Sequence, residues 1–387
     1  MELRLGTFNV WGLPEPFADD VTSRMRALAK RLDDLELDVL LVQEAWTDEV
    51  RDRLRKAGLR AGFEVAEASD APGGGLMALS RKPIRSSTFE RFHFRGDPER
   101  VAKGEYLGGK GFQTLTIESG GGAVTIINTH LHARYRRERP RLNSAVRTAQ
   151  LLQIVGAAHR IEGPLLVGGD FNCVPGDPEY RVFAHLAGLE EVAEDERLHP
   201  TISKANFYKR HRSGSDKRID LIFVRGEAGS SFTARDSRLL FAEPERIRGK
   251  DRALSDHYGF QSKIRLPDVG LAVARASQGE ADPQTFDLAR GLLQVGREEA
   301  TRRERAHLRY AAFWAMGATV AAGLRRHPSL DRRSFLRGSA GALALLSLAP
   351  AFGYTTLARV DAGQKRDAFD DAHAVLGRLE SRPGGTA

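Results

Sequence analysis

The sequence predicts a mixed α/β domain followed by a helical C-terminal tail, and three observations support this. Up to Leu266, short β-like runs recur between amphipathic helical stretches. The Ser-Gly-Gly-Gly segment at 119–122 separates two alternating runs as a hairpin turn does, so part of the sheet must be antiparallel. After Leu266 the composition changes, first to Gly, Ala, Ser, Gln and Asp and then to Arg-rich and apolar helical sequence.

The predicted strands are short runs rich in apolar and β-branched residues, bounded by polar or turn-forming residues. They fall at 3–10, 38–43, 76–79, 112–118, 123–128, 164–168, 219–224 and 258–264. The predicted helices repeat apolar residues every three or four positions, which gives each of them one apolar face. They fall at 23–35, 48–57, 143–159 and 179–186. We expect these helices to cover the faces of the sheet.

The change in composition divides the chain into a domain over residues 1–266, a linker over 267–283 and a helical tail over 284–387. Two segments of the tail, 310–324 and 338–358, are apolar. The second approaches the ~20 residues that cross a bilayer, whereas the shorter first segment suits a re-entrant or interfacial helix. We therefore expect the tail to associate with a membrane. The alternative is a pair of Ala-rich helices packed on the domain.

Charge and cysteine content narrow the functional classes. The formal net charge of +8 suits an anionic partner, such as a phosphodiester, a nucleic acid or an acidic membrane surface. The single cysteine, Cys173, excludes an internal disulfide, and we expect it to be a small buried hydrophobe. Because residues 2–10 read as a strand, we expect no N-terminal signal peptide and a cytosolic start.

Polar residues gather where the predicted strands end. An Asn or Asp after one strand is usually a turn former or helix cap, but repetition on successive strands is harder to attribute to capping. Active sites of layered α/β folds collect at such strand ends. The clusters are Asn9, Gln43-Glu44, Asn128-Thr129-His130, Gly169-Asp170-Phe171-Asn172 and Ser255-Asp256-His257.

These residue types suit the hydrolysis of a phosphodiester. Glu44, with Asn9 and Asp170, offers the hard oxygen ligands that Mg²⁺ prefers. Such a metal polarises the phosphoryl oxygen and neutralises charge on the leaving group. The sequence lacks a Gly-rich phosphate loop, a serine nucleophile elbow and Cys/His zinc spacing, which gives no support to NTP binding, a serine hydrolase or structural zinc.

A histidine and carboxylates supply the complementary acid–base chemistry. His257 follows Asp256, and a carboxylate such as Asp220 can orient the imidazole and raise its basicity, so that it deprotonates a water molecule. His130 and Asn172 are then the donors expected around the phosphate.

Taken together, these motifs resemble the endonuclease/exonuclease/phosphatase superfamily over residues 3–265. This group includes DNase I-like nucleases, abasic-site endonucleases, inositol-phosphate phosphatases and neutral sphingomyelinases. The resemblance implies a four-layer α/β sandwich, in which helices flank two mixed β-sheets, and a Mg²⁺ cofactor, with Mn²⁺ as an alternative. It implies the following roles: Glu44 as principal metal ligand assisted by Asn9, Asp170 and Asn172 near metal and phosphate, His257 as general base paired with Asp220, His130 on the phosphate, and Asp256 as a second metal-site or water-positioning acid.

Flanking residues are most similar to the neutral sphingomyelinase branch. The sequence reads Asn-Val-Trp-Gly-Leu-Pro at 9–14, Gln-Glu-Ala-Trp at 43–46 and Thr-His-Leu-His-Ala at 129–133. Lys110 and Gly111 resemble a Lys-Gly segment of that branch in which the Lys faces the substrate. Lys110 is therefore a candidate substrate-binding residue, and a solvated hairpin residue is the alternative reading.

The function this resemblance implies is Mg²⁺-dependent, phospholipase C-type cleavage of a phospholipid such as sphingomyelin, giving ceramide and phosphocholine. The partners would be the lipid and the membrane surface, with the catalytic domain on the cytoplasmic side, and no protein partner is indicated. A nuclease is one alternative, in which the basic run at 134–141 contacts a nucleic-acid backbone. A phosphoinositide-type phosphatase and a non-catalytic scaffold are the others. Trp11, Trp46 and Phe17, if exposed near the site, would favour an interfacial substrate.

Overall fold

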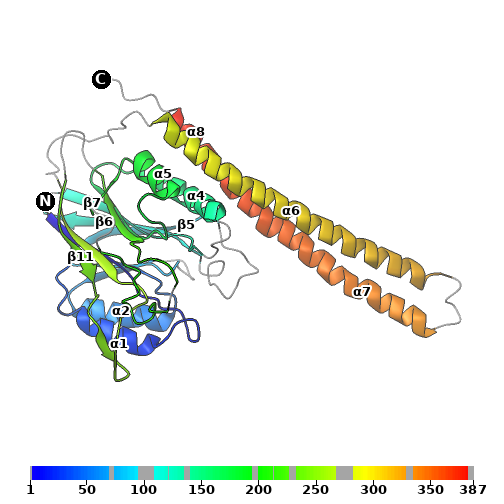
Figure 1. The fold of residues 1–387 in the computed structure, drawn as a ribbon, viewed down its shortest axis with the longest axis horizontal. Helices are drawn as coiled ribbons and strands as arrows, with labels where there is room; N and C mark the ends of the chain where they lie inside the picture. Colours follow the sequence, from blue (N-terminus) through cyan, green and yellow to red (C-terminus); the bar gives the residue numbers. More distant parts are fainter. Residues whose placement is uncertain are drawn as a thin grey trace.

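The computed structural model describes residues 2–68, 74–94, 109–120, 122–134, 140–193, 199–211, 213–225, 232–266, 282–327 and 334–381. Within these ranges two six-stranded β-sheets pack together, helices cover their outer faces, and a long helical hairpin extends from one side (Figure 1). This architecture confirms the predicted four-layer sandwich with a helical tail.

Both sheets are mixed. The first has the strand order β11-β14-β1-β2-β4-β3 and the second has β5-β6-β7-β8-β10-β9. Only the β1–β2 and β7–β8 pairs are parallel among these neighbours. The strands are β1 Glu2–Asn9, β2 Val39–Gln43, β3 Glu64–Glu67, β4 Met77–Ser80, β5 Ile84–Arg91, β6 Gly111–Ser119, β7 Gly122–His130, β8 Leu165–Asp170, β9 Glu190–Glu191, β10 Asp220–Val224, β11 Thr233–Leu240 and β14 Gly259–Arg265, and a separate ribbon pairs β12 Glu245–Ile247 with β13 Lys250–Arg252.

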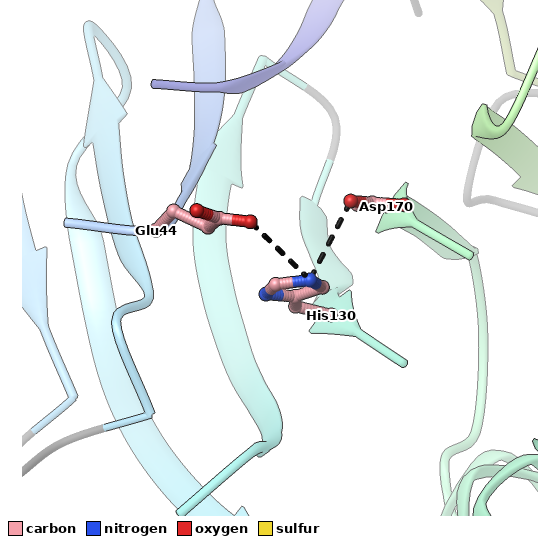
Figure 2. A group of neighbouring side chains, drawn as sticks. All are labelled: Glu44, His130 and Asp170. Atoms are coloured by element: carbon pink, nitrogen blue, oxygen red, sulfur yellow. Dashed lines mark ion pairs between the residues drawn. The ribbon is translucent and has the colours of Figure 1, made fainter. Parts of the chain in front are cut away.

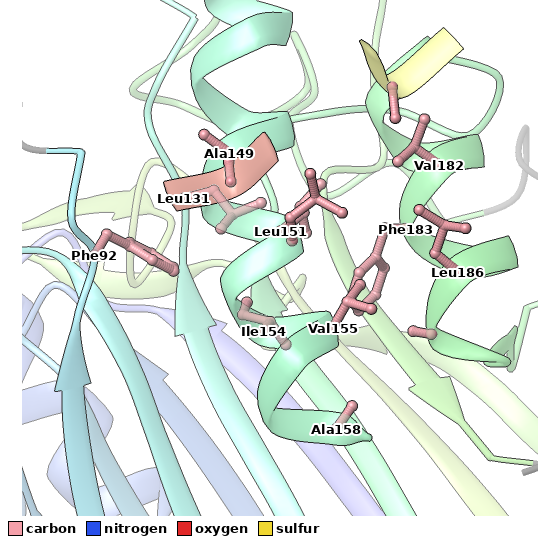
Figure 3. Packing of buried hydrophobic residues seen from close by; sticks show 14 of the residues in the cluster. Phe92, Leu131, Ala149, Leu151, Ile154, Val155, Ala158, Val182, Phe183 and Leu186 are labelled. Atoms are coloured by element: carbon pink, nitrogen blue, oxygen red, sulfur yellow. The ribbon is translucent and has the colours of Figure 1, made fainter. Parts of the chain in front are cut away.

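Three clusters of buried apolar side chains hold the layers together. One lies between the two sheets and contains Leu41 of β2 and Leu166 of β8. A second lies between the first sheet and the helices α1 Val21–Arg31 and α2 Asp48–Arg60. The third lies between the second sheet and the helices α4 Pro140–Ala158 and α5 Pro178–Ala187 (Figure 3).

Cys173 belongs to the third cluster and is fully buried, as the sequence predicts. Burial holds the pKa of its thiol well above the ordinary value. A thiol that stays protonated and buried has the character of a small hydrophobe and not that of a nucleophile.

The tail is a helical hairpin whose base shares the core of the sandwich. Helix α6 Pro283–Arg325 packs against α7 Ser334–Thr356, the π-helical segment η3 Leu357–Ala362 and α8 Gly363–Glu380. Side chains from the first part of α6 and from α8 lie in the third cluster with residues of α4 and α5. These tail residues are Phe286, Ala289, Leu292, Leu293, Ala300, Ala368, Phe369, Ala372 and Leu376.

The rest of the hairpin projects away from the sandwich (Figure 1). We call residues 305–325 of α6 together with α7 the distal hairpin. It exposes large apolar side chains. In the described part of the chain, the helical stretch Gly338–Glu380 contains an 18-residue window that is apolar and long enough to cross a membrane, and 17% of that window is buried. The exposed side chains are Tyr310, Phe313, Trp314, Met316, Val320, Leu324, Phe335, Leu336, Leu343, Leu345, Leu346, Leu348 and Phe352.

Candidate active site

Several strand ends meet at one edge of the sandwich. Asn9 closes β1, and Glu44 follows its parallel neighbour β2. In the second sheet the register places Asp170 beside His130 of β7 on one side and beside Asp220 of β10 on the other. The strand pairing therefore brings together side chains that lie far apart in the sequence.

Gly169 allows the close approach of β7 and β8 at this edge. Its φ is +146°, and a Cβ atom at this position would lie 1.9 Å from the Thr129 carbonyl oxygen. Any side chain would push the two strands apart. The glycine therefore helps to place Asp170 next to His130.

An amide group joins the two central carboxylates. The Nδ2 atom of Asn9 donates to Glu44 Oε1 at 2.9 Å and to Asp170 Oδ2 at 3.0 Å. Its Oδ1 atom accepts from the Trp11 backbone N–H at 3.0 Å. Glu44 itself has a φ of +61°, in the left-handed region that side-chain-bearing residues avoid, as is common at functional sites.

His130 lies between the carboxylates (Figure 2). Its Nε2 atom is 3.8 Å from Glu44 Oε1, 3.5 Å from Asp170 Oδ2 and 2.9 Å from Lys110 Nζ. Lys110 is buried and also donates to the Leu131 carbonyl at 2.8 Å. The two acidic groups thus face basic groups across a small space.

The acidic groups fit a divalent cation. Burial raises the pKa of Glu44, and the nearby Asp256 raises it further. Burial and the charge of Asp220 raise the pKa of Asp170 to about 7. Glu44 Oε2 is buried and has no hydrogen-bond partner among the described residues. Two neighbouring carboxylates that resist ionisation, one with a spare oxygen, form a donor set that a hard cation such as Mg²⁺ would stabilise.

His257 and Asp220 form a buried pair beside this cluster. His257 Nδ1 is 3.0 Å from Asp220 Oδ2, and His257 Nε2 is 4.0 Å from Asp170 Oδ2. Burial acts to lower the pKa of His257, but Asp220, together with Asp256 and Asp170, outweighs burial and raises it to about 10. Because Asp220 holds Nδ1, the other ring nitrogen is the one directed toward Asp170.

Asp256 and Asn172 complete the group of predicted residues. The Oδ2 atom of Asp256 lies 2.5 Å from Lys209 Nζ. Burial acts to raise the pKa of Asp256, but Lys209 and His257 reverse this and lower it. Asn172 lies just after β8 and has a φ of +51°. Its Nδ2 atom donates to the Leu131 carbonyl at 3.1 Å.

One cavity of about 360 Å³ unites these side chains. Asn9 and Asp220 lie behind its wall, each hydrogen-bonded to a residue that lines it. Of the basic run at 134–141, Arg134 lines the cavity, and residues 135–139 lie outside the described part of the chain. The predicted residues that line the cavity are Glu44, Lys110, His130, Asp170, Asn172, Asp256 and His257.

Sequence reasoning missed two basic residues of this cavity. Lys209 and Lys217 line it, but both lie in irregular chain between β9 and β10, where no strand end marks them as candidates. Trp11 and Trp46 line the cavity as the interfacial interpretation requires, whereas the exposed Phe17 does not.

Comparison with known proteins gives the family. The model of the Endonuclease/Exonuclease/phosphatase family matches residues 6–257. A predicted neutral sphingomyelinase of Drosophila melanogaster is 30% identical over 278 residues, covering 69% of this chain and 61% of the relative. The inositol phosphosphingolipids phospholipase C of Schizosaccharomyces pombe is 26% identical over 322 residues, covering 73% of each chain.

A solved structure shares the fold. The crystal structure of beta toxin from Staphylococcus aureus superposes with a TM-score of 0.56 at 19% identity, covering 67% of this chain and 99% of that one. At this identity the likeness concerns the fold alone. This chain spans 61% of the length of the Drosophila relative. Because the family model covers more than half of the sequence, the chain belongs to the endonuclease/exonuclease/phosphatase family, and its relatives include neutral sphingomyelinases, as the strand-end motifs predict.

Proposed function

We propose that this protein is a metal-dependent phosphoric diester hydrolase that cleaves a sphingolipid headgroup in the manner of a phospholipase C. The observation that carries the proposal is one cavity that Glu44, Asp170 and His257 all line, with Asp220 hydrogen-bonded to His257 behind its wall. The names of two relatives, a neutral sphingomyelinase and an inositol phosphosphingolipids phospholipase C, support the sphingolipid class. Sphingomyelin, cleaved to ceramide and phosphocholine, is the substrate we propose first.

Glu44 and Asp170 are the groups that would hold the cation, which we take to be Mg²⁺, with Mn²⁺ as a substitute. When bound, the ion would polarise a phosphoryl oxygen and offset charge on the leaving oxygen. Asn9 would position the two carboxylates, since its amide nitrogen bonds both and its oxygen is engaged by the Trp11 N–H. Asp256, ionised and paired with Lys209, would act at a second metal position or orient water.

His257 would act as general base. Its Nε2 atom would accept a proton from the attacking water, the water oxygen would bond to phosphorus, and the bond from phosphorus to the lipid oxygen would break, with that oxygen taking up a proton to leave as the alcohol. Asp220 orients the ring through Nδ1 and stabilises the imidazolium that forms. A pKa of about 10 would leave the ring protonated at neutral pH. Charge repulsion from a cation held by Glu44 and Asp170 would lower that pKa toward the working range.

Lys110, His130 and Asn172 would bind the phosphate oxygens. All three line the cavity, and the N–H groups of an ammonium, an imidazole and an amide are donors suited to an anionic phosphorane. Lys110 and His130 lie 2.9 Å apart, so they would reach neighbouring oxygens of one phosphate.

The distal hairpin would bind the membrane that contains the substrate. It exposes many aromatic and aliphatic side chains, whereas the described surface of the sandwich exposes only two large apolar side chains, Phe17 and Leu59. Exposed Arg305 and Arg309 border the apolar part of α6 on one side, and Arg325 and Arg326 border it on the other. Because arginines flank both ends, the charge distribution does not fix an orientation. We propose that the catalytic domain lies on the cytoplasmic side of the membrane. We also propose that residues 1–266 form the catalytic domain, residues 267–283 the linker and residues 284–387 the tail.

A side-by-side assay tests the substrate class. Purified full-length protein is incubated with Mg²⁺ and sphingomyelin, an inositol phosphosphingolipid, a phosphoinositide, or nicked and abasic DNA. We expect a water-soluble phosphorylated headgroup from a sphingolipid and no cleavage of DNA. Cleavage of DNA with intact sphingolipids would favour the nuclease alternative, and release of inorganic phosphate from the phosphoinositide would favour a phosphatase.

A further inference from the structure

Arg24 of α1 is fully buried, and its guanidinium donates four hydrogen bonds to backbone carbonyl oxygens. Its Nε donates to Asp19 at 2.8 Å, and its Nη2 donates to Trp11 at 2.7 Å. Its Nη1 donates to Val10 at 2.8 Å and to Leu254 at 3.0 Å. Burying a guanidinium is costly unless its donors are satisfied, and here the backbone of three separate segments accepts four hydrogen bonds from it.

Two of these segments carry the candidate active site. Val10 and Trp11 directly follow Asn9, which bonds the two carboxylates of the proposed cation site. Leu254 directly precedes the Ser-Asp-His segment that contains His257. One side chain therefore bonds both the segment that follows Asn9 and the segment that precedes His257.

The guanidinium also packs against two rings that contact each other, with 5.3 Å between their centroids. Its central carbon lies 4.8 Å from the Trp11 ring centroid and 5.7 Å from that of Tyr208. Trp11 lines the cavity, and Tyr208 precedes Lys209, which pairs with Asp256. We call Arg24 with Trp11 and Tyr208 the Arg24 clamp.

We propose that Arg24 is a positioning residue for the reaction. The Arg24 clamp fixes the position of the Asn9 amide, which bonds Glu44 and Asp170, relative to His257. This inference rests on the proposed function for its catalytic consequence. Proton transfer and attack in line with the leaving group both require the base and the cation site at a set separation, and small displacements slow such steps strongly. Arg24 would act through the backbone, and it does not line the cavity.

A matched residue allows a structural role to be separated from a positioning role. Arg225 is also buried, at 5% exposure, and also donates to carbonyl oxygens, to Ile161 at 2.7 Å and to Ala158 at 2.6 Å. Burial lowers the pKa of both Arg24 and Arg225. Arg225 does not line the cavity.

The experiment compares Arg24→Lys with Arg225→Lys in the full chain. Lysine keeps the positive charge but its compact ammonium cannot reach carbonyls on opposite sides of a planar guanidinium. We measure the thermal unfolding midpoint, kcat and KM on the best substrate, and Mn²⁺ affinity from the free-ion paramagnetic resonance signal. Both variants should lose stability. Only Arg24→Lys should lose kcat, by about tenfold or more with KM little changed, and weaken Mn²⁺ binding.

Several outcomes would overturn the proposal. Wild-type kcat and Mn²⁺ affinity in folded Arg24→Lys would do so, as would equal losses of both quantities in the two variants. If the wild type cleaves no lipid, the proposed function fails, while the Mn²⁺ comparison still decides the role of the clamp. If Arg24→Lys does not fold, Tyr208→Leu removes the ring packed against the guanidinium and leaves Arg24 in place. Unchanged kcat and Mn²⁺ affinity in that variant would contradict the clamp.

Discussion

Glu44 and Asp170 are buried carboxylates whose pKa values lie above their ordinary range, because burial and neighbouring acids disfavour the charged form. A divalent cation reverses this preference, since it favours the ionised form of both groups. Its binding should therefore release protons near neutral pH, where the pKa of Asp170 lies at about 7. This coupling links the geometry of two side chains to the metal dependence of the whole reaction.

The first prediction concerns the proposed principal ligand. Glu44→Gln keeps the shape of the side chain but removes its charge, so we expect a loss of roughly two to four orders of magnitude in kcat at fixed Mg²⁺. The unfolding midpoint should stay near the wild-type value or rise, because a carboxylate that is costly to bury becomes neutral. A folded Glu44→Gln protein with wild-type kcat would rule out Glu44 as a ligand.

The second prediction concerns the His257–Asp220 pair. His257→Ala and Asp220→Asn should each lower kcat by roughly two to four orders of magnitude. The two residues share one hydrogen bond and one function, so the double variant should be little worse than either single variant. Steady-state kinetics of all four proteins checks this. Losses that multiply in the double variant would show that the residues work separately.

The third prediction is a shift in pH dependence. Only neutral His257 can accept a proton, so kcat/KM should rise with pH through the pKa of this group. Asp220 raises that pKa against the effect of burial, so Asp220→Asn should lower it and move the acid limb to lower pH, beneath a reduced plateau. The measurement is kcat/KM against pH for both proteins. A limb that stays in place would mean that another group controls it.

Single residues also show how far the sequence alone could predict the site. Motifs at strand ends predict Glu44 and His257 because a strand end is visible in the sequence. The direction of an amide is not visible, and the structure turns the Asn9 nitrogen toward the carboxylates. Lys209 could not be predicted, because the fold of an irregular loop brings it to Asp256.

At the scale of elements, the predicted strands are the central ones and the missed strands are mainly at sheet edges. The four edge strands β11, β3, β5 and β9 all lie outside the predicted runs. The edge strands β5 and β11 read Ile-Arg-Ser-Ser-Thr-Phe-Glu-Arg and Thr-Ala-Arg-Asp-Ser-Arg-Leu-Leu, which are largely polar and exposed. Edge strands bury less apolar surface and carry charges that discourage pairing with other chains, so their apolar pattern is weak.

The fourth prediction tests the distal hairpin. Full-length protein should float with phospholipid vesicles and remain bound in high salt, which releases electrostatic binders. Replacing Phe313, Trp314, Leu345 and Leu346 by Ser removes exposed apolar side chains that contact no core cluster. This variant should lose salt-resistant flotation and keep kcat on detergent-dispersed substrate.

Leu59→Ser provides the matched control for that experiment. Leu59 is an exposed leucine of α2, on the sandwich and outside the tail. The Leu59→Ser protein should float with vesicles as the wild type does. Salt-resistant flotation of the fourfold Ser variant, or its loss in Leu59→Ser, would contradict the assignment of membrane binding to the distal hairpin.

At the scale of the whole molecule, the tail both extends from the sandwich and completes its core. Composition changes after Leu266, but Phe286 and Leu293 of α6 and Phe369 of α8 share a buried cluster with α4 and α5, against which the tail helices pack. Removing the tail near residue 280 would expose that apolar face. The boundary at 266 stays a prediction, and the experiments above therefore use the full chain with surface substitutions in the distal hairpin.

The central claim is that a metal ion bound in this cavity supports cleavage of the bond between phosphorus and the lipid oxygen of a sphingolipid. A single measurement tests this claim most directly. Purified full-length protein is assayed on sphingomyelin in mixed micelles, with Mg²⁺, with excess EDTA, and with EDTA followed by Mg²⁺, and the water-soluble product is identified by mass. We predict phosphocholine with Mg²⁺, none in EDTA because the phosphoryl and leaving oxygens lose their charge partner, and full recovery when the metal returns. Phosphocholine release that continues undiminished in EDTA would contradict the account.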